Sequence, residues 1–195
     1  NRDLAVSGGG GAGERWVSVL LGKGNGTFAA KTDYASGLQP MYVAIGDFNA
    51  DGKQDLVTVS ALSGTVSGLL GNGDGTFGPR TDFYAGYHAA SVGIGDFNAD
   101  GKLDLATPNY SSVNSVSVLL GNGDGTFAAR TDYVTGIHPQ SVAVGDFNGD
   151  AGPDLAVANY TPNTVSVLLN IGAATSGVGP GVNSDMARLF TLTPN

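Results

Sequence analysis

Three short segments of the chain carry side-chain oxygens at a regular spacing. Residues 47–56 read Asp-Phe-Asn-Ala-Asp-Gly-Lys-Gln-Asp-Leu, and close copies stand at 96–105 and 146–155. In each copy, acidic or amide side chains occupy positions 1, 3, 5 and 9. A loop that curls around an ion can turn such side chains inward, and a hard cation that takes many oxygen ligands suits them. The spacing therefore predicts three Ca²⁺ sites, one in each loop.

The expected ligands are the side chains at positions 1, 3, 5 and 9 and the backbone carbonyl at position 7. They are Asp47, Asn49, Asp51, Lys53 and Asp55 in the first loop; Asp96, Asn98, Asp100, Lys102 and Asp104 in the second; and Asp146, Asn148, Asp150, Gly152 and Asp154 in the third. The alternative is an Asp/Asn/Gly-rich turn that holds no ion. Three copies in register favour the metal loop, because an ion offsets the repulsion between clustered carboxylates.

The third loop departs from the pattern of the other two. Gly52 and Gly101 stand at position 6, where a sharp turn needs a positive φ, but Ala151 takes that place in the third loop and Pro153 follows. We expect Gly152 to make the turn one residue late and the third site to be the weakest or most distorted. An EF-hand is excluded, because position 12 is not Glu and the flanking residues favour strands.

Composition and charge exclude several classes of protein. With 32 Gly, 41% hydrophobic and only 13% charged residues, the 195-residue chain is typical of many short strands joined by tight turns. Nine of its 17 acidic residues belong to the predicted metal loops, and three bound Ca²⁺ ions would bring the formal charge of −8 to about −2. The nine Lys and Arg do not cluster, which argues against nucleic acid. No apolar run is long enough to span a membrane.

A unit of about 50 residues repeats along the chain. Each unit contains an apolar alternating run before the metal loop, a second run after it, a third run that ends in Val-Leu-Leu or a similar sequence, and a weaker fourth run. Four antiparallel strands per unit predict a β-propeller blade. The turn Gly-Asn-Gly-Asp-Gly-Thr-Phe at 71–77, with its copies at 22–28 and 121–127, is typical of a glycine-rich hairpin, and we expect Phe28, Phe77 and Phe127 to lie between neighbouring blades.

These motifs resemble the FG-GAP/VCBS repeat family, whose calcium-loop blades also occur in the heads of integrin α-subunits. The resemblance rests on Val-Ala-Ile-Gly-Asp-Phe-Asn-Ala-Asp-Gly-Lys-Gln-Asp-Leu at 43–56, on its two copies, and on the segment 117–127. It implies an all-β propeller-type array of four-stranded blades and bound Ca²⁺. It leaves function open, because the family includes adhesion heads, lectin-like modules and accessory domains of secreted enzymes.

About three and a half blades can be counted, with units at approximately 1–45, 46–94, 95–144 and 145–170. The first unit lacks an inner strand, because residues 1–4 align with the end of a metal loop. Residues 171–195 break the repeat and read as a linker followed by a possible strand at 186–193, which would complete the fourth blade, begin another domain or pair with a neighbouring molecule. We expect the chain to associate with other copies of itself or with the rest of a longer propeller.

Catalytic residues are not expected. The two histidines, His88 and His138, occupy the same place in successive repeats, and no Ser-His-Asp arrangement can be assembled from residues outside the repeat. A binding surface is more plausible, because propeller topology should gather several aromatic residues and the histidines at the end opposite the metal loops. These residues are Trp16, Tyr87, His88, Tyr110, His138 and Tyr160.

The sequence therefore favours an extracellular, calcium-stabilised repeat module for adhesion, for binding a glycan or an extracellular protein, or for self-assembly. We expect an extracellular location, because sites of this type are most useful where calcium is millimolar. The alternative is a non-catalytic accessory domain of a secreted enzyme that acts on polysaccharides.

Overall fold

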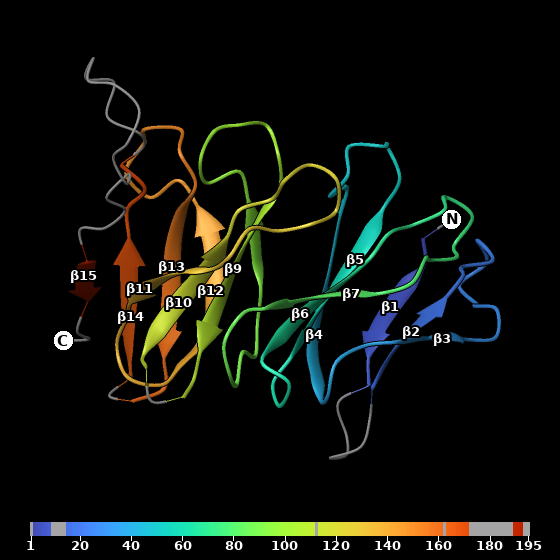
Figure 1. Ribbon diagram of the computed structural model, residues 1–195, viewed down its shortest axis with the longest axis horizontal. Coiled ribbons are helices and arrows are strands. Elements are labelled where there is room, and N and C mark those ends of the chain that lie inside the picture. Colours follow the sequence, from blue (N-terminus) through green and yellow to red (C-terminus); the bar gives the residue numbers. More distant parts are fainter. Residues whose placement is uncertain (1, 9–14, 112, 162, 172–188, 193–195) are drawn as a thin grey trace.

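The computed structural model describes residues 2–8, 15–111, 113–161, 163–171 and 189–192. The described residues form strands and turns without a helix, and the strands make four antiparallel sheets. The sheets stand in a row in chain order, from the β1–β3 sheet on the right of Figure 1 to the β12–β15 sheet on the left. This arrangement confirms an all-β, propeller-type array of blades.

The strands follow one another within each sheet, so each blade is a meander. The first blade contains β1 (Leu4–Ser7), β2 (Trp16–Leu20) and β3 (Thr32–Ala35); the second contains β4 (Pro40–Gly46), β5 (Asp55–Ser60), β6 (Thr65–Leu69) and β7 (Thr81–Tyr84). The third contains β8 (Gly93–Gly95), β9 (Asp104–Asn109), β10 (Ser115–Leu119) and β11 (Thr131–Val134); the fourth contains β12 (Pro139–Gly145), β13 (Asp154–Asn159), β14 (Thr164–Leu168) and β15 (Leu189–Leu192).

The two ends of the array differ from its middle. Among the described residues the first sheet has three strands, as the sequence predicts, because no strand pairs with the edge of β1 that faces away from β2. The fourth sheet is completed by β15, which pairs antiparallel with β14 and sets Val165 opposite Leu192. The predicted strand at 186–193 is thus described over 189–192 only, and the predicted linker at 172–183 lies outside the described residues.

Both faces of the inner blades are buried, which explains why their strands are almost continuously apolar or small. Along β5, Leu56 packs with Val17 and Val19 of the first blade, whereas Val57 and Val59 pack with Leu105 of the third. The same alternation repeats between the third and fourth blades. The core is therefore a series of layers between sheets, and each fully buried Val or Leu contributes roughly 1.5–3 kcal/mol.

The prediction that the turn phenylalanines lie between blades is confirmed for two of the three. Phe127 is 7% exposed and makes edge-to-face contacts with Phe48 and Phe83 of the preceding blade. Phe77 makes the equivalent contact with Tyr34. The prediction is wrong for Phe28, which is 37% exposed, because no blade among the described residues precedes the first one.

Candidate functional site

The three acidic loops lie at one end of the array. Each loop joins the first two strands of a complete blade, β4 to β5, β8 to β9 and β12 to β13. In Figure 1 these connections appear at the top of the molecule, in cyan, green and orange. The strands thus place all three predicted metal loops on the same side.

Within each loop, the oxygens at positions 1 and 3 converge on one backbone N–H. The N–H of Asp51 donates to both Asp47 Oδ1 and Asn49 Oδ1 at 3.1 Å. The second loop repeats this with Asp100, whose N–H lies 3.0 and 3.1 Å from its two acceptors, and the third with Asp150, at 3.2 and 2.9 Å. The local hydrogen bonds of the Asp and Asn side chains therefore suffice to curl the loop, without a contribution from an ion.

Position 5 is linked to position 7 in every loop. Asp51 Oδ1 accepts the N–H of Lys53, and the Lys53 Nζ lies 3.1 Å from Asp51 Oδ2. These hydrogen bonds lower the pKa of Asp51, and the bond from the Lys53 backbone has a larger effect than the bond from its side chain. Asp100 and Lys102 make the same pair at 3.2 Å. In the third loop Gly152 stands at position 7, so Asp150 has no such ammonium beside it.

Hydrogen bonds lower the pKa of other exposed carboxylates in the loops as well. Burial works against the ionised form of Asp100, yet hydrogen bonds from Lys102 and Asn98 outweigh it, and the pKa of Asp100 is lowered. Backbone N–H groups of Ala151 and Gly149 lower the pKa of Asp146. These carboxylates are therefore held ionised, as ligands for a cation must be.

The aspartates at position 9 are buried and bind backbone amides. Asp55 Oδ2 accepts the N–H of Phe48 at 2.9 Å, and its Oδ1 accepts the N–H of Gly71 at 2.8 Å. Asp104 does the same with Phe97 and Gly121, and Asp154 with Phe147 and Asn170. Burial raises the pKa of Asp104, against the opposing effect of those two N–H donors. Position 9 thus ties the loop to the end of the third strand of its blade.

The expectation for the turn of the third loop is wrong. Ala151 itself adopts the positive φ of 68°, close to the 79° and 82° of Gly52 and Gly101, and Gly152 does not take over the turn. The N–H of Ala151 still donates to Asp146 Oδ2 at 3.0 Å, as the position-6 glycines do in the other loops. The loop hydrogen bonds therefore hold Ala151 in a conformation that disfavours a Cβ.

The donor set of the loops suits a hard cation. Each loop gathers carboxylate and amide oxygens at positions 1, 3 and 5, and Ca²⁺ prefers such ligands. The described residues contain no group of three Asp, Glu or His side chains gathered as a preformed metal site. The carboxylate of position 9 turns toward backbone amides, although each of its oxygens has a second lone pair.

The predicted aromatic end is partly assembled. Tyr110 stacks on the ring of His138 with centroids 4.7 Å apart, and Tyr160 lies 6.5 Å from Tyr110. His138 Nδ1 is 3.2 Å from Thr161 Oγ1, and its backbone N–H donates to Asn114 Oδ1. The stack therefore bridges the third and fourth blades, with Tyr160 as its exposed member.

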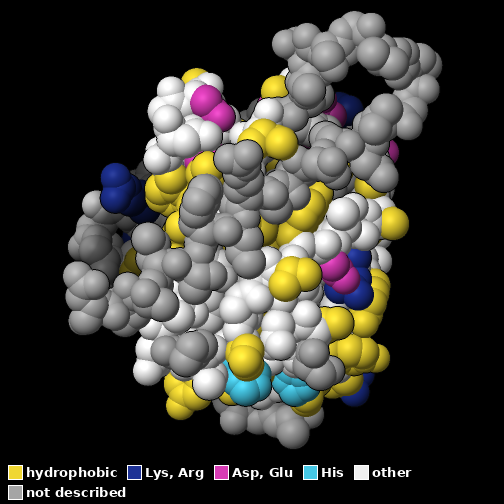
Figure 2. Space-filling model, turned by 90° about the vertical axis from the view of Figure 1, so that its left-hand side faces the viewer, with side chains coloured by type: hydrophobic (Ala, Val, Ile, Leu, Met, Phe, Trp, Pro, Cys, Tyr) yellow, Lys and Arg dark blue, Asp and Glu magenta, His cyan; other side chains and the backbone are white. Residues whose placement is uncertain are grey.

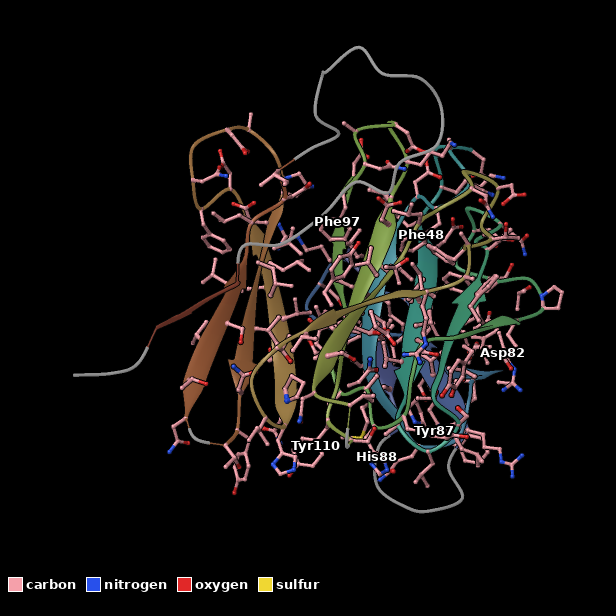
Figure 3. The ribbon with its side chains drawn as sticks, turned by 60° about the vertical axis from the view of Figure 1, so that its left-hand side comes forward. Phe48, Asp82, Tyr87, His88, Phe97 and Tyr110 are labelled. Carbon is pink, nitrogen blue, oxygen red and sulfur yellow. The ribbon has the colours of Figure 1, made fainter. Side chains whose placement is uncertain are left out.

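The other aromatic candidates lie apart from this stack. Tyr87 packs edge-on against Tyr84, and the Arg130 guanidinium lies 4.9 Å from the Tyr84 ring centre. Figure 3 shows Tyr87, His88 and Tyr110 at the end of the molecule away from Phe48 and Phe97. Figure 2 shows the histidines among hydrophobic side chains at that same end. Sequence reasoning missed Tyr84 and Arg130, because their contact crosses from one blade to the next.

Two further observations concern Trp16 and the histidines. Trp16 is 43% exposed and precedes Val17, which packs toward the second blade, so Trp16 faces the other side of its sheet. It makes no ring contact with another described aromatic residue. His88 and His138 have φ of 59° and 56°, like Gln39 at 55°. The repeated histidine therefore marks a recurrent backbone position at the entry of the first strand.

The chain is similar to a solved structure and to a family of repeats. A chain in the structure of the Photorhabdus luminescens Tc holotoxin pore is similar, with 21% identity over 84% of the present chain and a TM-score of 0.47. The match spans 8% of that chain. No curated protein matches, and no membrane-spanning helix was found in the described part of the chain. The model of the FG-GAP-like repeat matches residues 1–58, 47–107 and 108–157. The chain therefore belongs to the FG-GAP-like repeat family.

Proposed function

We propose that the chain is a calcium-stabilised, non-catalytic repeat module that works outside the cell. The observation that carries this proposal is the convergence of the position 1 and position 3 oxygens on a single N–H in all three loops. An ion at this point would be held by positions 1, 3 and 5 and by the carbonyl of position 7. When bound, Ca²⁺ would supply positive charge that offsets the repulsion between the loop carboxylates.

The role of position 9 in this proposal is to hold the loop in place. Asp55, Asp104 and Asp154 are buried, and each fixes the second residue of the loop to the end of the third strand. A free lone pair on these carboxylates is available to an ion as well. The loops are thus anchored on the blade, so that ion binding stabilises the junction of three strands.

The binding role is proposed for the aromatic end. Tyr160 is exposed next to the Tyr110–His138 stack, and an exposed aromatic ring beside hydroxyl and amide groups suits the face of a sugar ring or the edge of a protein. The module would therefore present a ligand at one end and hold its ions at the other. On this proposal, the module serves in adhesion or in another role that requires binding of a glycan or an extracellular protein.

Thermal unfolding tests the calcium proposal. A chelator should lower the melting temperature, and excess Ca²⁺ should restore it by mass action, whereas Mg²⁺ at the same concentration should restore less. A chain in which Asp51, Asp100 and Asp150 are all replaced by Asn is the matched control, and its melting should no longer respond to Ca²⁺. Equal melting of the unaltered chain with chelator and with Ca²⁺ would contradict the proposal.

A glycan array and a panel of extracellular proteins test the binding role separately. Any ligand of the aromatic end should bind the unaltered chain and lose affinity for Tyr160→Ala. Tyr42→Ala, which removes another exposed tyrosine on β4, is the control and should bind as well as the unaltered chain. A ligand that is insensitive to Tyr160→Ala would place the binding surface elsewhere.

A further inference from the structure

The tripeptide Asn-Gly-Asp occurs at residues 72–74, 122–124 and 148–150. The first two copies lie in the glycine-rich hairpin turns, and the third lies in the third acidic loop. The other two acidic loops have Asn-Ala-Asp at the same place, so only the third has glycine after its position 3 asparagine. Glycine after asparagine favours attack of the backbone nitrogen on the side-chain amide, because no Cβ hinders the approach.

The asparagines of the two hairpin turns are bound to the opposite arm of their turn. Asn72 Nδ2 donates to Thr76 Oγ1 at 2.8 Å, and the Asn72 backbone N–H donates to the carbonyl of Thr76 at 2.9 Å. Asn122 makes the same two bonds with Thr126, at 2.9 and 3.0 Å. The side-chain bond to the threonine must therefore break before either amide carbon can reach the next backbone nitrogen.

The asparagine of the third acidic loop is bound to its own stretch of backbone instead. Asn148 Oδ1 accepts the N–H of Asp150 at 2.9 Å, and Asn148 Nδ2 donates to Asp150 Oδ2 at 2.8 Å. This Asx turn folds the side chain over the peptide bond between Asn148 and Gly149, so the amide carbon is turned toward the Gly149 nitrogen. Asn148 is also exposed to water.

The hydrogen bonds of this loop also suit the two reacting groups. The N–H of Gly149 donates to Asp146 Oδ1 at 2.7 Å, so a carboxylate is in place to accept the proton that this nitrogen loses on attack. The N–H of Asp150 donates to Asn148 Oδ1, the oxygen on which negative charge develops. Among the described residues, the glycine N–H of the two hairpin sites has no such acceptor.

The glycine of each tripeptide has the same backbone conformation. Its φ is 85° at Gly73, 78° at Gly123 and 80° at Gly149, and the asparagine before it is exposed in all three cases. Local sequence, glycine conformation and exposure are thus alike at the three sites. What differs is the set of hydrogen bonds that holds the asparagine side chain and the glycine N–H.

We propose that Asn148 is a site of spontaneous deamidation, which the folded third loop favours over the two hairpin sites of identical sequence. The Gly149 nitrogen forms a bond with Asn148 Cγ, and the bond from Cγ to Nδ2 breaks. The proton of the Gly149 N–H passes by way of Asp146 Oδ1 to the departing nitrogen, which leaves as ammonia. Water then opens the resulting succinimide ring at either carbonyl, giving aspartate or isoaspartate at this position. The reaction transfers no electrons and needs no other reactant.

Either product changes the third acidic loop. Aspartate adds a carboxylate beside those of Asp146 and Asp150, and isoaspartate lengthens the backbone by a carbon atom just before the N–H on which positions 1 and 3 converge. The hydrogen bonds that favour deamidation form without an ion. The experiment therefore keeps a chelator present, and its outcome is independent of the proposed calcium sites.

The freshly purified full chain is incubated at mildly alkaline pH, digested at acidic pH, and analysed by peptide mass spectrometry, which follows the conversion of each asparagine. Asn148 should be converted at least about tenfold faster than Asn72 and Asn122, because only its side chain is held toward the attacking nitrogen. In denaturant the three sites should react at similar rates, since they share the sequence Asn-Gly-Asp.

Gly149→Ala is the matched variant. Ala99 occupies the same place in the second loop with φ of 58°, and a Cβ at Gly149 would meet nothing within 4 Å, so the loop should keep its shape. The variant should lose the conversion of Asn148, while Asn72 and Asn122 keep theirs. Equal rates at the three sites of the folded chain overturn the proposal, as does a lead of Asn148 that persists in denaturant or in Gly149→Ala.

Discussion

Asp104 Oδ1 accepts the backbone N–H of Gly121 at 2.7 Å, and this bond links the end of the second acidic loop to the end of β10. The other oxygen of the same carboxylate accepts the N–H of Phe97. A Cβ at Gly121 would lie 2.2 Å from the carbonyl oxygen of Leu103, so only glycine approaches this closely without a shift. The same clamp recurs as Asp3 with Gly22 and as Asp55 with Gly71.

Asp104→Ala should lower the free energy of unfolding by about 2–4 kcal/mol, because two backbone N–H groups lose their acceptor. Asp104→Asn should cost roughly half as much, since an amide presents one acceptor oxygen. Chemical denaturation in the presence of a chelator measures both. Asp100→Ala, at an exposed position of the same loop, is the control and should have little effect until Ca²⁺ is added. A loss in Asp104→Ala that appears only with Ca²⁺ would show that the clamp contributes nothing on its own.

Lys102→Met should raise the affinity of the second loop for Ca²⁺ by roughly two- to tenfold, because the ammonium 3.2 Å from Asp100 competes with the ion for that carboxylate. Calorimetric titration of a chain in which Asp51 and Asp150 are replaced by Asn isolates this loop. Lys31→Met, which breaks the pair with Asp33 on the first blade, is the charge-matched control. An unchanged affinity in Lys102→Met would argue against Asp100 as a ligand.

Ala151→Gly should stabilise the chain by about 0.5–1 kcal/mol, because relief of the positive φ exceeds the extra entropy that glycine gives the unfolded state. Ala99→Gly tests the same reasoning at position 4 of the second loop, where φ is 58° and the third loop already has Gly149. Thermal unfolding measures both. Destabilisation in both variants would mean that these turns relax around a Cβ without cost.

Gly136→Ala should destabilise the junction of the third and fourth blades by about 1–3 kcal/mol. An added Cβ would lie 2.5 Å from Asn159 Nδ2, which is buried and donates to Ser166 Oγ at 2.9 Å. Gly78→Ala is the control, since its Cβ would meet nothing closer than 3.7 Å. Equal unfolding free energies for the two variants would show that Asn159 moves aside freely.

Thr126→Val should raise the pKa of Asp124. Hydrogen bonds from the side chain and backbone of Thr126 hold the pKa of Asp124 below its usual value, so ionised Asp124 stabilises the fold above the pKa it has in the unfolded chain. That contribution is lost as the pH falls through the lower pKa of the folded chain. NMR of the side-chain carboxyl carbons measures the pKa of Asp124. Thr76→Val should raise the pKa of Asp74 instead. An unchanged pKa of Asp124 in Thr126→Val would mean that groups other than the Thr126 side chain lower it.

The sequence alone was sufficient for the repeat and the four-stranded blades, because these depend on local periodicity and on residue types that recur every 50 residues or so. It also placed the carboxylate and amide side chains of positions 1, 3 and 5 on one curled loop, since Asx hydrogen bonds act between residues a few positions apart. It did not anticipate Ala151 at a positive φ, because the hydrogen bonds of the whole loop override the preference of one residue.

Tertiary structure decided what depends on contacts between strands and blades. Only the fold shows that both carboxylate oxygens of Asp55, Asp104 and Asp154 accept backbone N–H groups. In each case one of the two donating residues lies 16 or 17 positions further along the chain. Only the stacking of blades joins Tyr110 to His138 and leaves Phe28 exposed while burying Phe127. Identical residues in a repeat acquire different surroundings according to which neighbours cover them, and a sequence of equivalent units carries no local signal of that difference.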